Sequence, residues 1–286
     1  MKLLKPPEIL EVTIETSVAK ADGSLRKLFV LAALAGAFIA FAAQGSTMAA
    51  FNLLAEAETF GLGRALAGAV FSTGLMLVVL AGAELFTGNT MMIAAVCEKK
   101  VKALRMIRNW CIVYAGNFAG SLLIAYMIAG SGLLGSGGGL LGAVTLNIAV
   151  YKVNLTFVSA FFLGILCNWL VCLAVWISSG ADAMAGKILG IFFPIWLFVT
   201  SGFEHSVANM YYVPAGILIK GNEVFAGLSG ATQGALQNLT WGGFFLRNLL
   251  PVTLGNVVGG SVFVALAYWY AYKKENATCA KRKKRV

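Results

Sequence analysis

Long apolar segments alternate with short polar ones along almost the whole chain. A helix needs about 20 mostly apolar residues to cross the hydrocarbon core of a bilayer. Six segments reach or exceed that length: 28–51, 63–97, 106–130, 155–179, 187–219 and 248–272. The pattern therefore predicts an all-α membrane protein with six transmembrane spans.

Two of these segments are too long and too interrupted to be single regular helices. Residues 83–89 read Ala-Glu-Leu-Phe-Thr-Gly-Asn, and residues 201–205 read Ser-Gly-Phe-Glu-His. Irregular backbone within a membrane is tolerated only where it is buried in protein or lines a cavity. We therefore expect spans two and five to be broken, with both breaks facing the interior of the protein.

A short motif occurs once in each half of the chain. Residues 116–121 read Gly-Asn-Phe-Ala-Gly-Ser, and residues 255–261 read Gly-Asn-Val-Val-Gly-Gly-Ser. Both are Gly-Asn-x-x-Gly patterns, which let helices approach closely. Span two then corresponds to span five, and span three to span six. Because three spans is an odd number, the halves are predicted to be inverted repeats, an arrangement that points to a transport site at the interrupted helices.

Composition and charge agree with a bilayer protein. Hydrophobic residues make up 59% of the chain and charged residues 12%, whereas soluble domains are about 25% charged. Of the 22 lysines and arginines, only Arg64, Lys152, Lys220 and Arg247 fall on one side of the six-span model. The positive-inside rule predicts cytoplasmic termini, a multi-pass protein of the inner (plasma) membrane, and outer loops at 52–62, 131–154 and 220–247.

The two ends of the chain are polar. Residues 1–27 alternate apolar and acidic positions, which suggests an amphipathic helix on the inner membrane surface. Residues 28–272 form the pore domain, and residues 273–286 form a basic cytoplasmic tail that we interpret as a topology determinant rather than a nucleic-acid site. The five cysteines show no metal-type spacing, so neither a metal nor a cofactor is expected.

The candidate chemistry centres on His205, the single histidine of the chain, which follows Glu204 in the second break. An ionisable pair at membrane depth marks an ion or substrate path, and histidine exchanges its proton near neutral pH. Thr87 lies in the first break. The neighbouring side chains are apolar, and they include Phe71, Leu75, Leu85, Phe86 and Phe198. This setting favours a small monovalent species that becomes neutral by taking a proton.

Each of these residues also has a simpler interpretation. A buried histidine can be a core residue with satisfied hydrogen bonds, and the apolar residues can be ordinary helix packing. Lys152 can be a solvated loop charge or an anion attractor at the entrance. Asn168 can bond a neighbouring helix, and Thr87 can cap a half-helix. These alternatives stay open from the residues alone.

Four strings together resemble one known family. They are residues 83–89, 164–176, 201–210 and 251–256, in this order along nearly the whole chain. The chain resembles the formate/nitrite transporter family. The resemblance implies an aquaporin-like six-helix protomer, assembled as a homopentamer with one pore per protomer. It also implies passage of formate, nitrite, hydrosulfide or similar small monovalent anions across the lipid bilayer. Protonation of the anion at His205, or gating by protonation of His205 itself, would make this transport pH-dependent and involve protons.

The resemblance also implies roles for individual residues. Thr87 is the polar residue of the loop that interrupts span two, and Lys152 is the outer basic residue that attracts the anion. His205 is the central polar site, supported by Glu204, Asn168 and Asn256. The apolar constrictions are Phe71, Leu75, Leu85, Phe86, Val171 and Phe198.

Two other functions fit the sequence less well. An aquaporin-like pore for water or small neutral solutes would carry paired Asn-Pro-Ala motifs, and the sequence contains none. An intramembrane enzyme would need a nucleophile with a base, or a metal cluster, and a single histidine with scattered cysteines argues against it. The sequence thus favours a transport protein over an enzyme.

Overall fold

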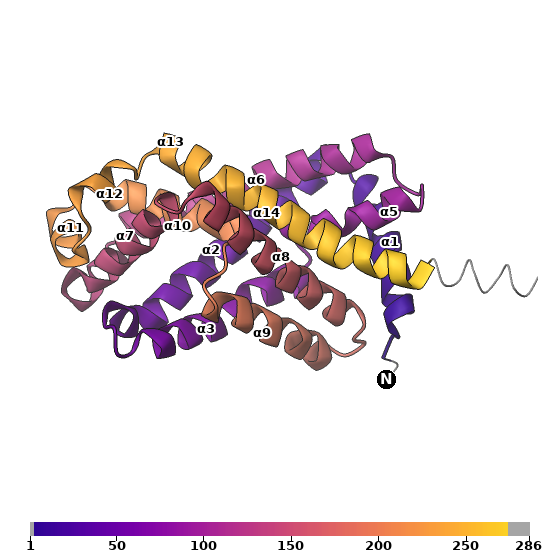
Figure 1. Cartoon of the computed structure of the whole chain (residues 1–286), viewed down its shortest axis with the longest axis horizontal. Helices are drawn as coiled ribbons and strands as arrows, with labels where there is room; N and C mark the ends of the chain where they lie inside the picture. The colour runs from indigo at the N-terminus through magenta and orange to yellow at the C-terminus, as the bar shows by residue number, and fades with distance from the viewer. Residues whose placement is uncertain (1–2, 274–286) are drawn as a thin grey trace, which may run out of the picture.

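The computed structural model describes residues 3–273, which are helical along most of their length and contain no strand. The helices form one elongated bundle (Figure 1). Six of the described helices are long and apolar enough to cross a membrane: α2 (Leu25–Ala55), α3 (Phe60–Leu80), α6 (Ala103–Gly130), Leu133–Val153, α8 (Phe157–Ser179) and Trp241–Lys273. The prediction of an all-α, multi-pass membrane protein is confirmed.

Both predicted breaks are present. After α3 the chain turns at residues 81–82, has no regular structure over 83–85, and then continues as α4 (Phe86–Asn89), η1 (Thr90–Met92) and α5 (Ile93–Cys97). The fifth segment divides into α9 (Met184–Thr200) and α10 (Ser206–Ile219). Each break contains a glycine with positive φ, 79° at Gly82 and 81° at Gly202, a conformation that glycine adopts without steric penalty.

One predicted loop is wrong. Residues 131–154 were expected to be an outer connection, but they contain η2 (Leu133–Gly139) and α7 (Leu140–Val153). Only the glycine-rich start behaves as a turn, with left-handed φ at Gly132 and Gly137. The rest packs against α2, α10 and α11 (Glu223–Ser229). Burial against these helices stabilises α7. The glycines and Lys152 in this stretch had led to the prediction of a loop.

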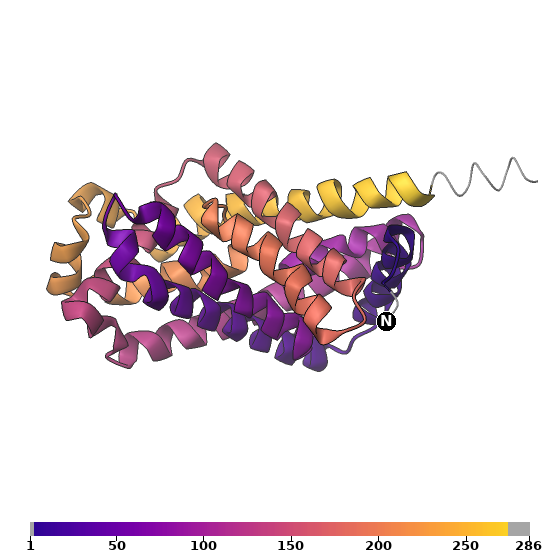
Figure 2. The same ribbon diagram turned by 90° about the horizontal axis from the view of Figure 1, so that it is seen from below.

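The N-terminal segment is helical, as expected, but it packs on protein. Helix α1 (Pro6–Ala21) contacts η1, α5, α6 and α8 and buries Ile9, Leu10 and Ile14. At the other end, Lys273 forms ion pairs with Glu11 and Glu98. Both ends of the described chain thus lie together, opposite α11 and α12 (Gln233–Gln237), as Figures 1 and 2 show. The remainder of the predicted basic tail, residues 274–286, lies outside the described residues.

The Gly-Asn motifs mark two very close helix crossings. A Cβ atom at Gly120 would lie 1.8 Å from the carbonyl oxygen of Ala33, and one at Gly255 would lie 2.2 Å from that of Phe161. The first contact joins α6 to α2, and the second joins α14 (Leu250–Gly260) to α8. Backbones meet at both crossings because no side chain separates them, as expected for GxxxG motifs.

Candidate functional site

The two breaks meet at one polar contact. Thr87 Oγ1, from the first break, lies 3.0 Å from His205 Nε2, from the second. Both residues are buried, with 0% and 3% exposure. On the other side of the ring, His205 Nδ1 accepts a hydrogen bond of 3.0 Å from the backbone N–H of Ala208. His205 is therefore the N-cap of α10 as well as the partner of Thr87.

This geometry fixes the tautomer of the imidazole. Because Nδ1 accepts a backbone N–H, the proton of the neutral ring is on Nε2 and points to Thr87. The Thr87 hydroxyl accepts it and keeps its own hydrogen for a second contact. A second ring proton, on Nδ1, would face the N–H of Ala208 and break the cap of α10. The contact is thus uncharged and holds two donors: the free Thr87 hydroxyl hydrogen, and the His205 Nε2–H, which reaches a ligand only when it leaves the Thr87 oxygen.

A polar network surrounds Glu204, in the second break. Lys152 Nζ contacts Glu204 Oε1 at 2.8 Å. The amide of Asn209 donates to Glu204 Oε2 at 2.7 Å, and the amide of Asn248 donates to the same oxygen at 3.4 Å. Glu204 and Lys152 are only 2% and 8% exposed. Lys152 is therefore a buried member of an ion pair, so the solvated loop charge considered from the sequence is wrong.

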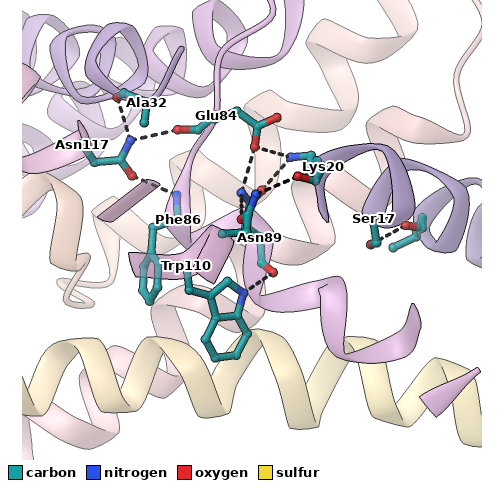
Figure 3. A network of polar contacts seen from close by, with 10 residues as sticks. Ser17, Lys20, Ala32, Glu84, Phe86, Asn89, Trp110 and Asn117 are labelled. Atoms are coloured by element: carbon teal, nitrogen blue, oxygen red, sulfur yellow. Dashed lines mark hydrogen bonds and ion pairs between the residues drawn. The ribbon is translucent and has the colours of Figure 1, made fainter. Parts of the chain in front are cut away.

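A matching network lies at the first break (Figure 3). Lys20 Nζ from α1 contacts Glu84 Oε2 at 3.2 Å and donates to Asn89 Oδ1 at 2.6 Å. The amide of Asn89 donates to Glu84 and to Asn109, at 2.8 and 2.9 Å. Sequence reasoning missed Lys20 and Asn109. The available signal was the spacing, because each break carries a glutamate followed five residues later by an asparagine.

The asparagines of the two Gly-Asn motifs fasten the breaks to neighbouring helices. Asn117 Oδ1 accepts the N–H of Phe86, and Asn256 Oδ1 accepts the N–H of Ser206, both at 2.9 Å. Each side-chain amide also donates to the glutamate carbonyl of its break and to a carbonyl of α2 or α8. The recurrence of these contacts supports the predicted repeat. Asn256 acts here as a tether of the backbone that precedes α10.

Asn168 holds the backbone of the first break. Its amide nitrogen lies 3.1 Å from the carbonyl oxygen of Thr87 and 2.6 Å from that of Asn256. The thiol of Cys172 is a further neighbour of the Thr87 carbonyl, at 3.4 Å. The structure therefore brings Asn168 to the centre as a helix-to-helix bond that positions Thr87.

The predicted apolar residues divide into two groups. Phe71 and Phe198 pack edge to face at 5.7 Å, and Phe198 lies 6.1 Å from the His205 ring. These two line a cavity of about 700 Å³ that also contacts Lys152, Glu204 and His205. Four others are buried outside its lining: Leu75, Leu85, Phe86 and Val171. The ring of Phe86 packs on Trp110 and Tyr114 of α6.

Comparisons with known proteins identify the family of the chain. Residues 7–270 match the family described as formate/nitrite transporter. The chain is 43% identical to a probable formate transporter of Methanothermobacter thermautotrophicus, over 90% of this chain and 92% of the relative. It is 38% identical to the formate channel FocA of Escherichia coli, over 96% of each.

A solved structure described as a pentameric formate channel with formate bound matches with a TM-score of 0.76 and 38% identity, covering 87% of this chain and 97% of that chain. These relatives are channels and transporters, which confirms the prediction of a transport protein rather than an enzyme. From the family match over nearly its whole length and from these relatives, the chain belongs to the formate/nitrite transporter family.

Proposed function

We propose that this protein is a pH-dependent channel for formate and similar small monovalent anions. The observation that carries the proposal is the pair of uncharged donors, Thr87 and His205, next to an apolar wall formed by Phe71 and Phe198. The relatives support formate as the substrate, since several of them are named as formate channels. Nitrite and hydrosulfide are of the same size and charge class and are expected to pass as well.

The proposed role of His205 is proton exchange with the anion. An isolated anion loses much solvation energy in an apolar passage, and two neutral donors restore only part of it. Transfer of a proton makes the ligand neutral. For His205 to give up its Nε2 proton and stay neutral, Nδ1 must first take one, which opens the Ala208 cap. Ring protonation and the start of α10 are then linked, and acid conditions favour the proton-donating state.

Uptake of labelled formate into proteoliposomes with an internal pH dye tests this proposal. The wild type is expected to take up formate with a matching pH change and a faster rate in acid. His205→Asn keeps a hydrogen-bonding group that does not titrate, so its flux should depend only weakly on pH. His205→Phe should remove the pH dependence. A wild-type pH profile in His205→Asn would show that His205 is only a structural cap.

A pore for small neutral solutes is the second candidate, because no net charge lies at the Thr87–His205 contact itself. Osmotic swelling of the same vesicles separates the two. Swelling in formate but not in urea or glycerol supports the anion channel. Equal swelling in all three solutes favours the neutral-solute pore.

We also propose a homopentamer with one pore in each protomer. The large exposed apolar side chains on α2, α6, α8 and α9, such as Phe41, Leu123, Phe162 and Phe193, suit contact with lipid or with other protomers. Native mass spectrometry in detergent tests the assembly directly. A monomer that still transports formate would refute it.

The proposed orientation places both termini in the cytoplasm and the connection after α10 outside. A cysteine introduced as Asn222→Cys should react with an impermeant maleimide in intact cells. A cysteine introduced as Lys100→Cys should react only after permeabilisation. The reverse labelling pattern would overturn the orientation.

A further inference from the structure

The cavity lined by Phe71 and Phe198, called the outer cavity after the proposed orientation, has an unbalanced positive charge. Three charged residues line it: Arg64, Lys152 and Glu204. Lys152 and Glu204 form a 2.8 Å ion pair, so their fields largely cancel at the distance of an approaching ion. The net charge of the lining therefore comes from Arg64.

Arg64 lies near the start of α3 and reaches across to the second break. Its Nη2 donates to the carbonyl oxygen of Val199, in the last turn of α9. A Cβ at Gly202 would lie 3.4 Å from the same nitrogen, so the guanidinium rests against the break itself.

The guanidinium has no carboxylate within ion-pair distance in residues 3–273. One bond to a carbonyl leaves it several N–H donors, and its fork suits a carboxylate or another small oxyanion. The nearest acidic residues in sequence, Glu56 and Glu58, are exposed on the α2–α3 connection and outside the cavity lining. Solvent and salt strongly screen the charges of these two glutamates, so they do not neutralise Arg64.

The two lysines of the polar networks do not provide this unpaired charge. Lys20 contacts Glu84 of the first break, as Lys152 contacts Glu204 of the second break. We infer that Arg64 is the residue that recruits small anions of the formate class to the outer cavity, and that it does so by unpaired charge. The inference rests on the proposed function and moves the role expected for Lys152 to a different residue.

Formate uptake by spheroplasts tests the inference at about 0.01 M and about 1 M salt, where the Debye length is about 30 and 3 Å. Arg64→Gln should raise the half-saturation concentration about fivefold at low salt, the effect of one unit charge across roughly 4 Å of water. At high salt it should match the wild type, and the maximal rate should be unchanged in both. Arg64→Lys keeps the charge and should restore the low-salt affinity.

Two further variants make the result decisive. Arg247→Gln removes an exposed arginine outside the cavity and should behave as the wild type. Asn147→Glu leaves Arg64 in place but adds a negative charge to an exposed position of the same lining, and should reproduce the low-salt loss even if Arg64→Gln fails to assemble.

If formate uptake by Asn147→Glu, or by an Arg64→Gln protein that assembles, depends on salt as in the wild type, the inference is overturned. The proposed formate transport then still stands. Absence of formate uptake by the wild-type protein overturns the proposed function and this inference with it.

Discussion

Replacing Thr87 by valine is the most direct test of the central contact. The change exchanges a hydroxyl for a methyl group of nearly the same shape at a position with 0% exposure. It removes the partner of His205 Nε2 at 3.0 Å. The remaining contacts of residue 87 are made by its carbonyl, which Asn168 holds, so the backbone of the first break should stay in place.

The expected effect follows from counting donors at the centre. An anion that replaces the Thr87 oxygen as acceptor of the His205 Nε2–H accepts from both this N–H and the Thr87 hydroxyl, whereas the variant leaves only the N–H. A hydrogen bond to a charged group contributes about 1.5–3 kcal/mol. If this bond is lost where the anion crosses its highest barrier, the flux should fall about 10- to 150-fold. Thr87→Ser keeps the hydroxyl and loses one methyl group, worth about 0.8 kcal/mol of burial, so its flux should stay near that of the wild type.

Initial rates of formate uptake in proteoliposomes, normalised to the amount of assembled protein, give the comparison. Size-exclusion elution and thermal stability of each variant show whether the assembly survives. A Thr87→Val protein that assembles and transports formate at the wild-type rate would refute the two-donor centre. If Thr87→Val and Thr87→Ser lose the same share of the uptake rate, the loss comes from altered packing and not from the missing hydroxyl.

Three other predictions concern the surroundings of this contact. Glu204→Gln leaves the buried Lys152 ammonium without its counter-charge and should destabilise the protein by about 3–5 kcal/mol, measured as a shift in detergent unfolding; an unchanged midpoint would contradict the ion pair. Phe198→Ala should let larger monocarboxylates pass while the oligomer stays intact, and unaltered selectivity in uptake assays would assign Phe198 to packing. Gly120→Ala should prevent assembly because its Cβ meets a backbone oxygen, whereas the matched control Gly130→Ala has no atom within 4 Å and should elute as the wild type.

The sequence by itself determined the class of the protein and the positions of its breaks. Apolar run length is a local property set by the thickness of a bilayer, so the spans that became α2, α6 and α8 could be located within a few residues. The interruptions around Glu84 and Glu204 were equally visible, because polar residues and glycines inside an apolar run have few structural explanations in a membrane. His205 and Thr87 could be named as candidates for the same reason.

Only the tertiary structure decided how these pieces are paired. The run at 140–153 was predicted to be a loop, yet it is a helix because three other helices bury it. The partnership of Lys152 with Glu204, and of Lys20 with Glu84, joins residues that lie 52 and 64 positions apart, and no local pattern encodes such distances. The same holds for Arg64, which in sequence is one more basic residue and in space touches the second break. Hydropathy reports whether a segment is buried, whereas ion pairing and tautomer choice depend on which buried segments face each other.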